Sequence, residues 1–149
     1  MNHLLLRRCT LDDLDEVEKI EKLSFSKPFS HYMFYFLLKN YPEGFIVVDD
    51  NGKIIGYIIY TVSGDKGTIV SIGVLPDYRR KGIGQMLIDH AIEDPRNKVS
   101  YVELQVSVSN AAAINLYHKN SFVIVNTMPR YYPDGEDAYL MKKMLNYTI

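Results

Sequence analysis

A run of cations followed by glycines, near the middle of the chain, has the residue types and spacing to bind a phosphate group. The run reads Arg79-Arg80-Lys81-Gly82-Ile83-Gly84. A strand-like run, Thr68–Leu75, precedes it, and an amphipathic run typical of a helix, Gly82–Ile92, follows. Glycines let the main chain approach a ligand, and a helix N-terminus presents N–H groups and a positive dipole to an anion. The sequence therefore predicts that this backbone binds a pyrophosphate and that the cations pair with its charge.

The spacing excludes two common nucleotide-binding loops. The P-loop requires Gly-Lys followed by Ser or Thr, whereas Gln85 follows Gly84 here. The dinucleotide-binding loop requires a third small residue, and the chain has Leu87 at that position. The pattern that remains is R-x-x-G-x-G, which by itself also fits a solvated basic turn with a glycine cap.

Three segments together resemble the Gcn5-related N-acetyltransferase (GNAT) superfamily. The first is R-x-x-G-x-G at Arg79–Gly84, which resembles that superfamily's coenzyme A pyrophosphate loop. The second, Asn110–Tyr117 followed by Ser121-Phe122, resembles the segment N-x-x-A-x-x-L-Y-x-x-x-G-F. The third, Tyr131–Tyr139, resembles the ending Y-Y-x-D-G-E-D-A of one branch, the RimI and archaeal-type protein N-α-acetyltransferases. The segments keep the family's order and spacing, and weaker similarity covers nearly the whole chain.

The resemblance implies acetyl-CoA as the acetyl donor and assigns residues to it. The pantetheine is expected on the strand backbone, the pyrophosphate on the loop, and the adenosine end near the helix that carries Tyr117. The implied contacts are Ile72, Gly73, Val74, Arg79, Arg80, Lys81, Gly82, Ile83, Gly84, Gln85, Asn110, Tyr117 and Lys119.

The same resemblance implies that Tyr117 gives a proton to the coenzyme A sulfur, but it leaves the base open. Relatives carry His, and then Glu or His, at the positions that match Thr68 and Gln105. Neither Thr nor Gln can accept a proton near neutral pH, although both can hold a water. Our hypothesis is that water ordered by Gln105 suffices, because an α-amine with a pKa of about 7.7–8.0 is already partly neutral. Glu103, two residues earlier on the same strand face, is the alternative.

Two further segments resemble the peptide-binding parts of N-terminal acetyltransferases. One is Pro28-Phe29-Ser30, and the other is Tyr131-Tyr132. Together they imply a narrow site that admits a chain end better than a lysine side chain. Some relatives carry Glu where this chain has Phe29, so we expect a preference for small or apolar first residues such as Ala, Ser or Met. Asp134–Asp137 reads as a turn.

Length, net charge and cysteine count are those of an ordinary globular domain and exclude few functions. The 149 residues are expected to form one domain, 1–149, and the net charge of −1 gives no general attraction to nucleic acid or an anionic membrane. The single cysteine, Cys9, suits a reducing compartment and is expected to be a buried bystander. No targeting segment, membrane-spanning run or His/Cys metal cluster is visible, so the expected location is the cytoplasm.

The elements that position these residues follow the order β-α-α-β-β-β-α-β-α-β-β. A capping box, Thr10–Asp13, opens the first helix, with Leu11, Leu14, Val17 and Ile20 on one side. The remaining elements are expected at 31–39, 45–48, 53–60, 68–75, 82–92, 99–108, 110–117, 121–126 and 138–144, after a strand at 4–8. Ser30 and Asn110 are expected to cap the helices that follow them, and Asp49–Gly52 is expected to form a hairpin turn. Pattern alone gives α/β (α+β) with a mostly antiparallel sheet. The resemblance implies the GNAT fold, in which two central strands, here Thr68–Leu75 and Val99–Val108, splay apart around the pantetheine.

The function that the resemblance implies is a protein N-α-acetyltransferase, which transfers acetyl from acetyl-CoA to protein or peptide N-termini. Two alternatives stay open: a lysine or small-amine acetyltransferase of the same fold, and a non-catalytic acyl-CoA-binding module. An auxiliary subunit or a ribosome is a possible partner, and a monomer is the simplest expectation for the chain alone.

Overall fold

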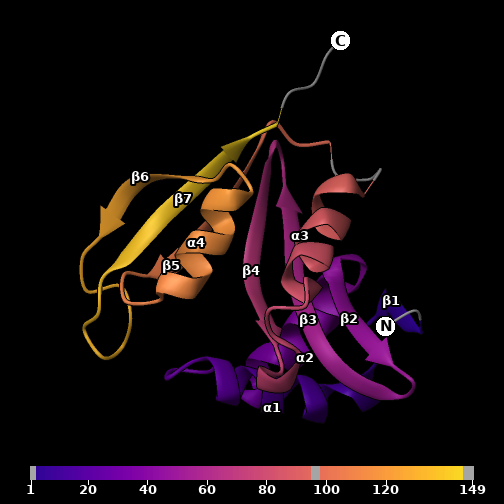
Figure 1. The fold of residues 1–149 in the computed structure, drawn as a ribbon. Helices are drawn as coiled ribbons and strands as arrows, with labels where there is room; N and C mark the ends of the chain where they lie inside the picture. The colour runs from indigo at the N-terminus through magenta and orange to yellow at the C-terminus, as the bar shows by residue number, and fades with distance from the viewer. Residues whose placement is uncertain (1–2, 95–97, 146–149) are drawn as a thin grey trace. The chain divides into compact units, whose positions relative to one another are not determined.

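The computed structural model of the protein describes residues 3–94 and 98–145 (Figure 1). Over these residues the helices and strands follow the predicted order. They are β1 (Leu4–Arg8), α1 (Leu14–Ser24), α2 (His31–Asn40), β2 (Phe45–Asp50), β3 (Lys53–Ser63), β4 (Lys66–Val74), α3 (Ile83–Glu93), β5 (Tyr101–Ser107), α4 (Ala111–Lys119), β6 (Val123–Met128) and β7 (Ala138–Met144). Among the described residues, no helix is long and apolar enough to cross a membrane.

Hydrogen bonding links the strands in the order β1-β2-β3-β4-β5-β7-β6. The pairs β1–β2, β2–β3, β5–β7 and β6–β7 are antiparallel, and β4–β5 is parallel. The predicted class, α/β with a mixed and mostly antiparallel sheet, is therefore confirmed. The chain forms two compact units, residues 1–60 with 71–94 and residues 61–70 with 95–149. The single domain expected from the sequence stays a prediction.

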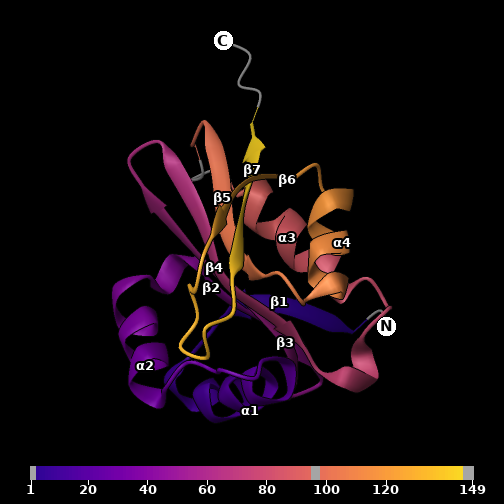
Figure 2. The ribbon, with the colours of Figure 1, turned by 90° about the vertical axis from the view of Figure 1, so that its left-hand side faces the viewer.

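In the first unit, strands β1–β3 carry helices on both faces. A Cβ atom on Gly56 of β3 would lie 3.2 Å from Ile83 of α3. The next residue, Tyr57, bonds Glu21 of α1 and meets the Phe34 ring of α2 at a centroid distance of 6.2 Å. Adjacent strand residues point to opposite faces, so α3 covers one face and α1 and α2 cover the other, as Figure 2 shows.

Helix α1 begins later than its capping box suggests. Thr10 and Asp13 form the predicted box, but the box caps a 3-10 turn, Leu11–Asp13. Leu14 is buried as predicted, whereas Leu11 is 63% exposed, so its predicted place on the buried side is wrong. The tighter winding of a 3-10 turn rotates Leu11 away from the face that α1 buries.

In the second unit, β5 is the central strand. It pairs with β7 along its whole length and with β4 at only three residue pairs, the last being Thr68↔Glu103. The predicted divergence of the two strands beyond this ladder stays a prediction. Val102, Leu104 and Val106 bury one face of β5, and Glu103 and Gln105 lie half-buried on the other.

Strand β6 begins two residues later than predicted. Ser121 has a φ of +69°, a left-handed conformation that terminates a helix and cannot continue into a strand. Phe122 then turns back, and its N–H donates to the Tyr117 carbonyl at 3.0 Å. The predicted strand at 121–126 is therefore observed at Val123–Met128.

Candidate functional site

The predicted phosphate loop has the backbone geometry of an anion site. Gly82 caps α3 with a φ of +80°, and Arg80 also has a positive φ, +62°. No side chain caps the helix, and its first turn contains no acidic residue. Because the first N–H groups of a helix lack intrahelical acceptors, those of Ile83 and Gly84 are directed toward an incoming anion. The loop therefore fits a pyrophosphate through its main chain.

The three cations of the loop have different surroundings. Arg79 donates to the Val74 carbonyl at 3.1 Å and to Ser24 Oγ at 3.2 Å, so it ties the loop to β4 and α1. Lys81 Nζ lies 5.5 Å from the centre of the Tyr78 ring. Arg80 is exposed. Arg80 and Lys81 are thus the better placed of the three to reach a phosphate, and Arg79 shapes the loop.

The predicted pantetheine strand alternates in burial. Ile72 and Val74 are half-buried, and Gly73 between them is buried. A Cβ atom on Gly73 would lie 2.7 Å from Cε1 of Tyr57, so only glycine fits against that ring. This close approach fixes β4 against β3 at the point where the pantetheine is predicted to bind.

The predicted substrate segment Pro28–Ser30 joins α1 to α2. Ser30 Oγ accepts from the Met33 N–H at 3.2 Å and so caps α2, as predicted. The Phe29 ring is half-buried and meets the Phe34 ring edge-on at a centroid distance of 5.9 Å. Phe29 N–H donates to Glu21 Oε2 at 2.7 Å. Pro28 and Ser30 are exposed.

Glu21 also belongs to a buried polar cluster that was not predicted from the sequence. Its other oxygen, Oε1, accepts from Tyr57 Oη and from Ser71 Oγ, the latter at 2.9 Å. Tyr57 Oη and Ser71 Oγ are themselves 2.9 Å apart. The sequence carries one sign of this cluster, because Glu21 lies four residues after Val17 and therefore on the apolar face of α1. A charged residue at such a position indicates a buried partner.

In the second unit, Tyr117 is buried on α4 and its ring packs against Phe122 at a centroid distance of 5.9 Å. Burial, with a smaller contribution from Tyr132, raises the pKa of Tyr117 above its ordinary value. Within the described part of the chain, its hydroxyl has no hydrogen-bond partner. A protonated, uncommitted hydroxyl is what a proton donor requires.

The two candidates for the base differ in their contacts. Glu103 forms an ion pair with Lys66 Nζ at 3.2 Å and stands opposite Thr68 in the β4–β5 ladder. Gln105 is half-buried on the same face and pairs with Leu140 of β7. The Glu103 carboxylate is thus engaged by Lys66. The role of Gln105 in holding water and that of Glu103 as the alternative base stay predictions.

Asn110 and Lys119 lie at the two ends of α4. Asn110 Oδ1 accepts from the Ala113 N–H at 3.2 Å and caps the helix, as predicted. Lys119 is exposed in the last turn. Their predicted contacts with coenzyme A stay predictions.

The loop with Tyr131 and Tyr132 is held by Glu136, a residue that the sequence predicted only as part of a turn. The two tyrosine rings meet edge-on at a centroid distance of 5.0 Å. Glu136 Oε1 accepts from Ser107 Oγ at 2.5 Å and from Ser109 N–H at 3.2 Å, and these bonds lower its pKa. Burial, with nearby Tyr131 and two acidic groups, raises the pKa of Tyr132 to about 12. Glu136 therefore anchors the tyrosine loop to the end of β5.

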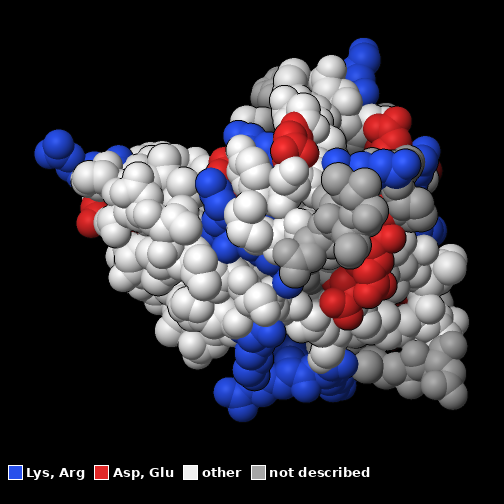
Figure 3. Space-filling model, turned by 90° about the horizontal axis from the view of Figure 1, so that it is seen from above, with Lys and Arg blue, Asp and Glu red and all other residues white. Residues whose placement is uncertain are grey.

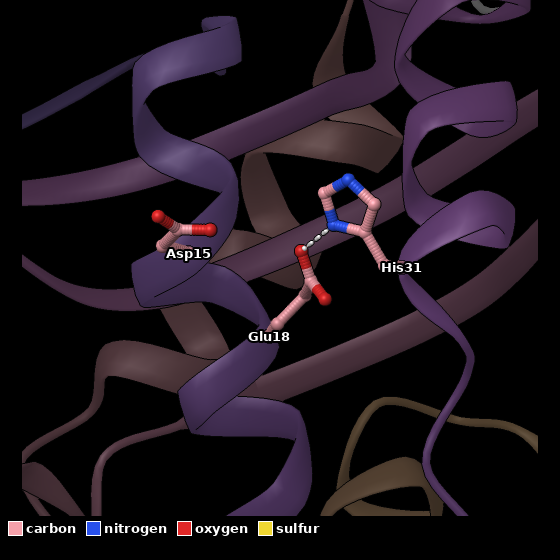
Figure 4. Close-up of side chains that lie close together, drawn as sticks. All are labelled: Asp15, Glu18 and His31. Carbon is pink, nitrogen blue, oxygen red and sulfur yellow. Dashed lines mark hydrogen bonds and ion pairs between the residues drawn. The ribbon is translucent and has the colours of Figure 1, made fainter.

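One group of side chains could hold a cation by its types alone. Ligand atoms of Asp15, Glu18 and His31 lie within 4.8 Å of one another. In Figure 4 the His31 ring points from α2 toward Glu18 on α1, and Nδ1 is 2.6 Å from Glu18 Oε2. Asp15 and His31 are exposed. We interpret the contact between Glu18 and His31 as a hydrogen-bonded pair that joins α1 and α2.

The single cysteine lies where it is unsuited to act as a nucleophile. Cys9 is free and buried, and burial raises its pKa to about 12, which disfavours a thiolate nucleophile.

Surface charge is mixed on the face shown in Figure 3. Lys and Arg form several small groups there, as do Asp and Glu, so neither sign of charge covers the described part of this face. A local basic loop rather than a broad basic surface is what the sequence predicted.

The predicted residues therefore divide between the units. The first unit brings together the 79–84 loop, the end of β4 and the segment Pro28–Ser30. The second unit carries the predicted catalytic residues, the tyrosine pair, Asn110 and Lys119.

Comparison with known proteins agrees with the resemblance in the sequence. A model of the acetyltransferase (GNAT) family matches residues 14–122. An N-alpha-acetyltransferase of Sulfurisphaera tokodaii is 37% identical over 150 residues, which cover 91% of this chain and 90% of that protein. The crystal structure of Ard1 from Thermoplasma volcanium matches with a TM-score of 0.92 and 27% identity, over 97% of this chain and 99% of that one. A chain of the NatC complex bound to Gag peptide and CoA matches with a TM-score of 0.88 and 25% identity, over 97% and 99% of the two chains. The predicted fold is thereby confirmed.

Proposed function

Because the chain belongs to the acetyltransferase (GNAT) family, we propose that it is a protein N-α-acetyltransferase that uses acetyl-CoA and works as one domain. The observation that carries the proposal is the open N-terminus of α3, where Gly82 and Arg80 have left-handed backbones and no side chain fills the cap. Bound acetyl-CoA supplies an activated acetyl group as a thioester, and the chain's residues bind and orient it.

Coenzyme A is bound mainly by backbone groups. The N–H groups of Ile83 and Gly84 meet the pyrophosphate, with Arg80 and Lys81 beside it. The edge of β4 at Ile72–Val74 offers main-chain groups to the pantetheine. Gln85, Asn110 and Lys119 complete the predicted contacts, and Arg79 holds the loop to Val74 and Ser24.

Acetyl transfer needs a neutral amine and a proton for the departing sulfur. An α-amine with a pKa of about 7.7–8.0 is partly neutral at pH 7, whereas a lysine amine with a pKa of about 10.4 is not. After the neutral amine attacks the thioester carbonyl, its nitrogen loses a proton to water held by Gln105, which passes it to bulk solvent. As the carbon–sulfur bond breaks, Tyr117, kept protonated by burial, gives its hydroxyl proton to the sulfur and then regains a proton from solvent.

The amine comes from a protein or peptide N-terminus. Phe29 presents a half-buried ring to the first substrate residue, and Tyr131 and Tyr132 bond the backbone of the first residues. An apolar ring cannot pair with an acidic side chain, so small or apolar first residues are preferred.

A partner subunit is a further part of the proposal. One similar structure is a complex, NatC, and helix α2 exposes aromatic side chains, among them Tyr32 at 83% and Phe36 at 52%. Large exposed apolar side chains on one helix are typical of a protein interface. The chain alone is expected to be a cytoplasmic monomer, and light scattering of the purified chain checks its mass.

Incubation with acetyl-CoA and a mixed peptide library, followed by mass spectrometry, tests the function. Blocked N-termini with apolar or small first residues are the expected products. Acetylated side chains would identify a lysine or small-amine acetyltransferase instead. Coenzyme A binding without transfer to any peptide would contradict catalysis and leave an acyl-CoA-binding module.

A further inference from the structure

Glu21 is a buried acidic residue on a helix face that is otherwise apolar. Its neighbours on that face are Leu14, Val17 and Ile20, and Glu21 itself is only 2% exposed. Among the described residues, no Lys, Arg or His forms an ion pair with it. Burying a carboxylate without a cation is costly unless hydrogen bonds satisfy its oxygens, so the bonds that Glu21 makes are the reason it is tolerated there.

The carboxylate joins three segments that lie far apart in the sequence. Oε1 accepts from Tyr57 of β3 and from Ser71 of β4, and Oε2 accepts from the main chain of Phe29. All three donors and Glu21 belong to the same compact unit. The helix thus holds the substrate segment and the pantetheine strand through one side chain.

The bond to Phe29 differs from the other two because its donor is a main-chain group. A side-chain donor can be lost without moving the backbone, whereas the Phe29 N–H fixes the backbone of the segment Pro28–Ser30. Ser71 lies two residues before Gly73 on the same face of β4. Any shift of Glu21 therefore displaces the Phe29 backbone relative to the strand on which the pantetheine is proposed to bind.

We propose that Glu21 is a positioning residue that sets the place of Phe29, and with it the place of the substrate's first residue, relative to the acetyl donor. This inference rests on the proposed function. Glu21 is too deeply buried to touch the substrate, so its effect passes through the Phe29 backbone and the Phe29 ring. Loss of the carboxylate frees the segment without altering the 79–84 loop, because the bonds of Arg79 to Val74 and Ser24 do not involve Glu21.

The Glu21→Gln variant separates positioning from proton transfer. Its amide oxygen can keep the Phe29 bond, while its NH2 group donates to the hydroxyl oxygens of Tyr57 and Ser71, which can rotate to accept. Positioning therefore survives in this variant. A proton acceptor would not survive, because an amide cannot take a proton near neutral pH.

The test combines kinetics with amide hydrogen exchange on the full chain. In Glu21→Ala, the KM for an Ala- or Met-initiated peptide is expected to rise about tenfold, because buried donors lose their acceptor. Exchange at the Phe29 amide is expected to quicken by a similar factor, and the Kd of coenzyme A to stay within about twofold. Glu21→Gln is expected to resemble the unaltered chain in all three measurements. Glu21→Asp, which keeps the charge but shortens the reach, is expected to show the Ala pattern and serves if the Ala variant does not fold.

The matched control is Glu18→Ala, one turn earlier on the same helix, where the carboxylate pairs with exposed His31. It is expected to leave peptide KM and the Phe29 amide unchanged. Unchanged exchange at Phe29 in Glu21→Ala or Glu21→Asp would overturn the proposal. So would a loss of kcat in Glu21→Gln at constant peptide KM, which would identify a proton acceptor. Exchange is measured without acetyl transfer, so its outcome stands apart from a failure of the proposed enzymatic function.

Discussion

The phosphate loop at residues 79–84 and the substrate segment Pro28–Ser30 lie in the same compact unit but are fixed by different means. The backbone of the loop is set by adjacent residues, with Gly82 at a φ of +80° and an open helix N-terminus, and Arg79 then ties the loop to β4 and α1. The segment takes its place from Glu21, whose buried carboxylate also bonds residues of β3 and β4. A backbone conformation set by adjacent residues can be predicted from the sequence. Contacts between distant residues, such as those of Glu21, can be seen only in the folded structure.

Tyr117 belongs to neither region, so removal of its hydroxyl shows the effect expected of a residue that acts in the chemistry alone. In Tyr117→Phe, kcat is expected to fall about 100-fold, because a positioned proton donor contributes factors of that size. The Kd of coenzyme A and the peptide KM should change less than about twofold, since the ring and its packing remain. Steady-state kinetics with both substrates varied measures this. An unchanged kcat would remove Tyr117 from the chemistry.

The Gly82→Val variant is designed to strain the backbone of the 79–84 loop and to leave the substrate segment unchanged. A β-branched residue at a φ of +80° is strained by about 1–3 kcal/mol, so the affinity for acetyl-CoA is expected to fall about 30-fold. The Phe29 amide should keep its exchange rate. Titration calorimetry with coenzyme A measures the affinity.

The control for that variant is Gly64→Val, at a φ of +60° with open space around it. It carries similar strain outside the loop and should lower stability without lowering affinity for coenzyme A. Equal losses of affinity in both variants would show that the backbone of the 79–84 loop does not bind coenzyme A specifically.

Phe29→Ala tests the substrate segment by specificity rather than by rate. Removal of the ring is expected to reduce discrimination between Met-initiated and Asp-initiated peptides about tenfold, while the Glu21 bond to the main chain persists. Competition between the two peptides in one reaction measures the ratio of kcat/KM values. Tyr32→Ala is the control, because Tyr32 on α2 is 83% exposed, and it should leave the ratio unchanged. A preference for acidic first residues in the unaltered chain would refute the role assigned to Phe29.

The pH profile tests whether the amine side lacks a base of its own. The rate is expected to rise as the substrate α-amine loses its proton near pH 7.7–8.0. It should not fall again below about pH 10, because burial raises the Tyr117 pKa above its ordinary value and keeps the donor protonated. Peptides whose α-amines differ in pKa should shift the rising limb by the same amount. A limb that stays at one pH for all peptides would reveal an ionising group on the enzyme.

Gln105→Ala gives the smallest effect, a loss of a few-fold in kcat, because water remains available without its side chain. Glu103→Gln is its partner variant, and it should break only the ion pair with Lys66. A sharp loss in Glu103→Gln, or full activity in Gln105→Ala, would reverse the assignment.

The sequence predicted most of what depends on local pattern. The glycine at the start of α3, the Ser30 and Asn110 caps, and the Asn51-Gly52 turn at φ values of +51° and +94° are all encoded by neighbouring residues. Ser121 is an exception, because a left-handed serine at the end of α4 has no glycine to announce it. Leu11 is another, since a capping box does not tell a 3-10 turn from an α-helix.

The Glu21 cluster could not be assembled from the sequence. Its partners Tyr57 and Ser71 are 36 and 50 residues away along the chain. Only the pairing of strands and the packing of α1 place the three side chains together. The sequence offered one local sign, a carboxylate on an apolar helix face, without naming its partners. Glu136 is similar, because it bonds Ser107 and Ser109 from a distant loop.

A titration of the isotopically labelled chain with coenzyme A, followed by NMR of individual backbone amides, tests the central contrast most directly. The amides of Ile83 and Gly84 are expected to shift strongly and exchange more slowly, because they bind the pyrophosphate. The Phe29 amide should keep its shift and its slow exchange, since Glu21 already holds it. Large shifts at Phe29 with none at Ile83 and Gly84 would contradict both the site assigned to the cofactor and the role assigned to Glu21.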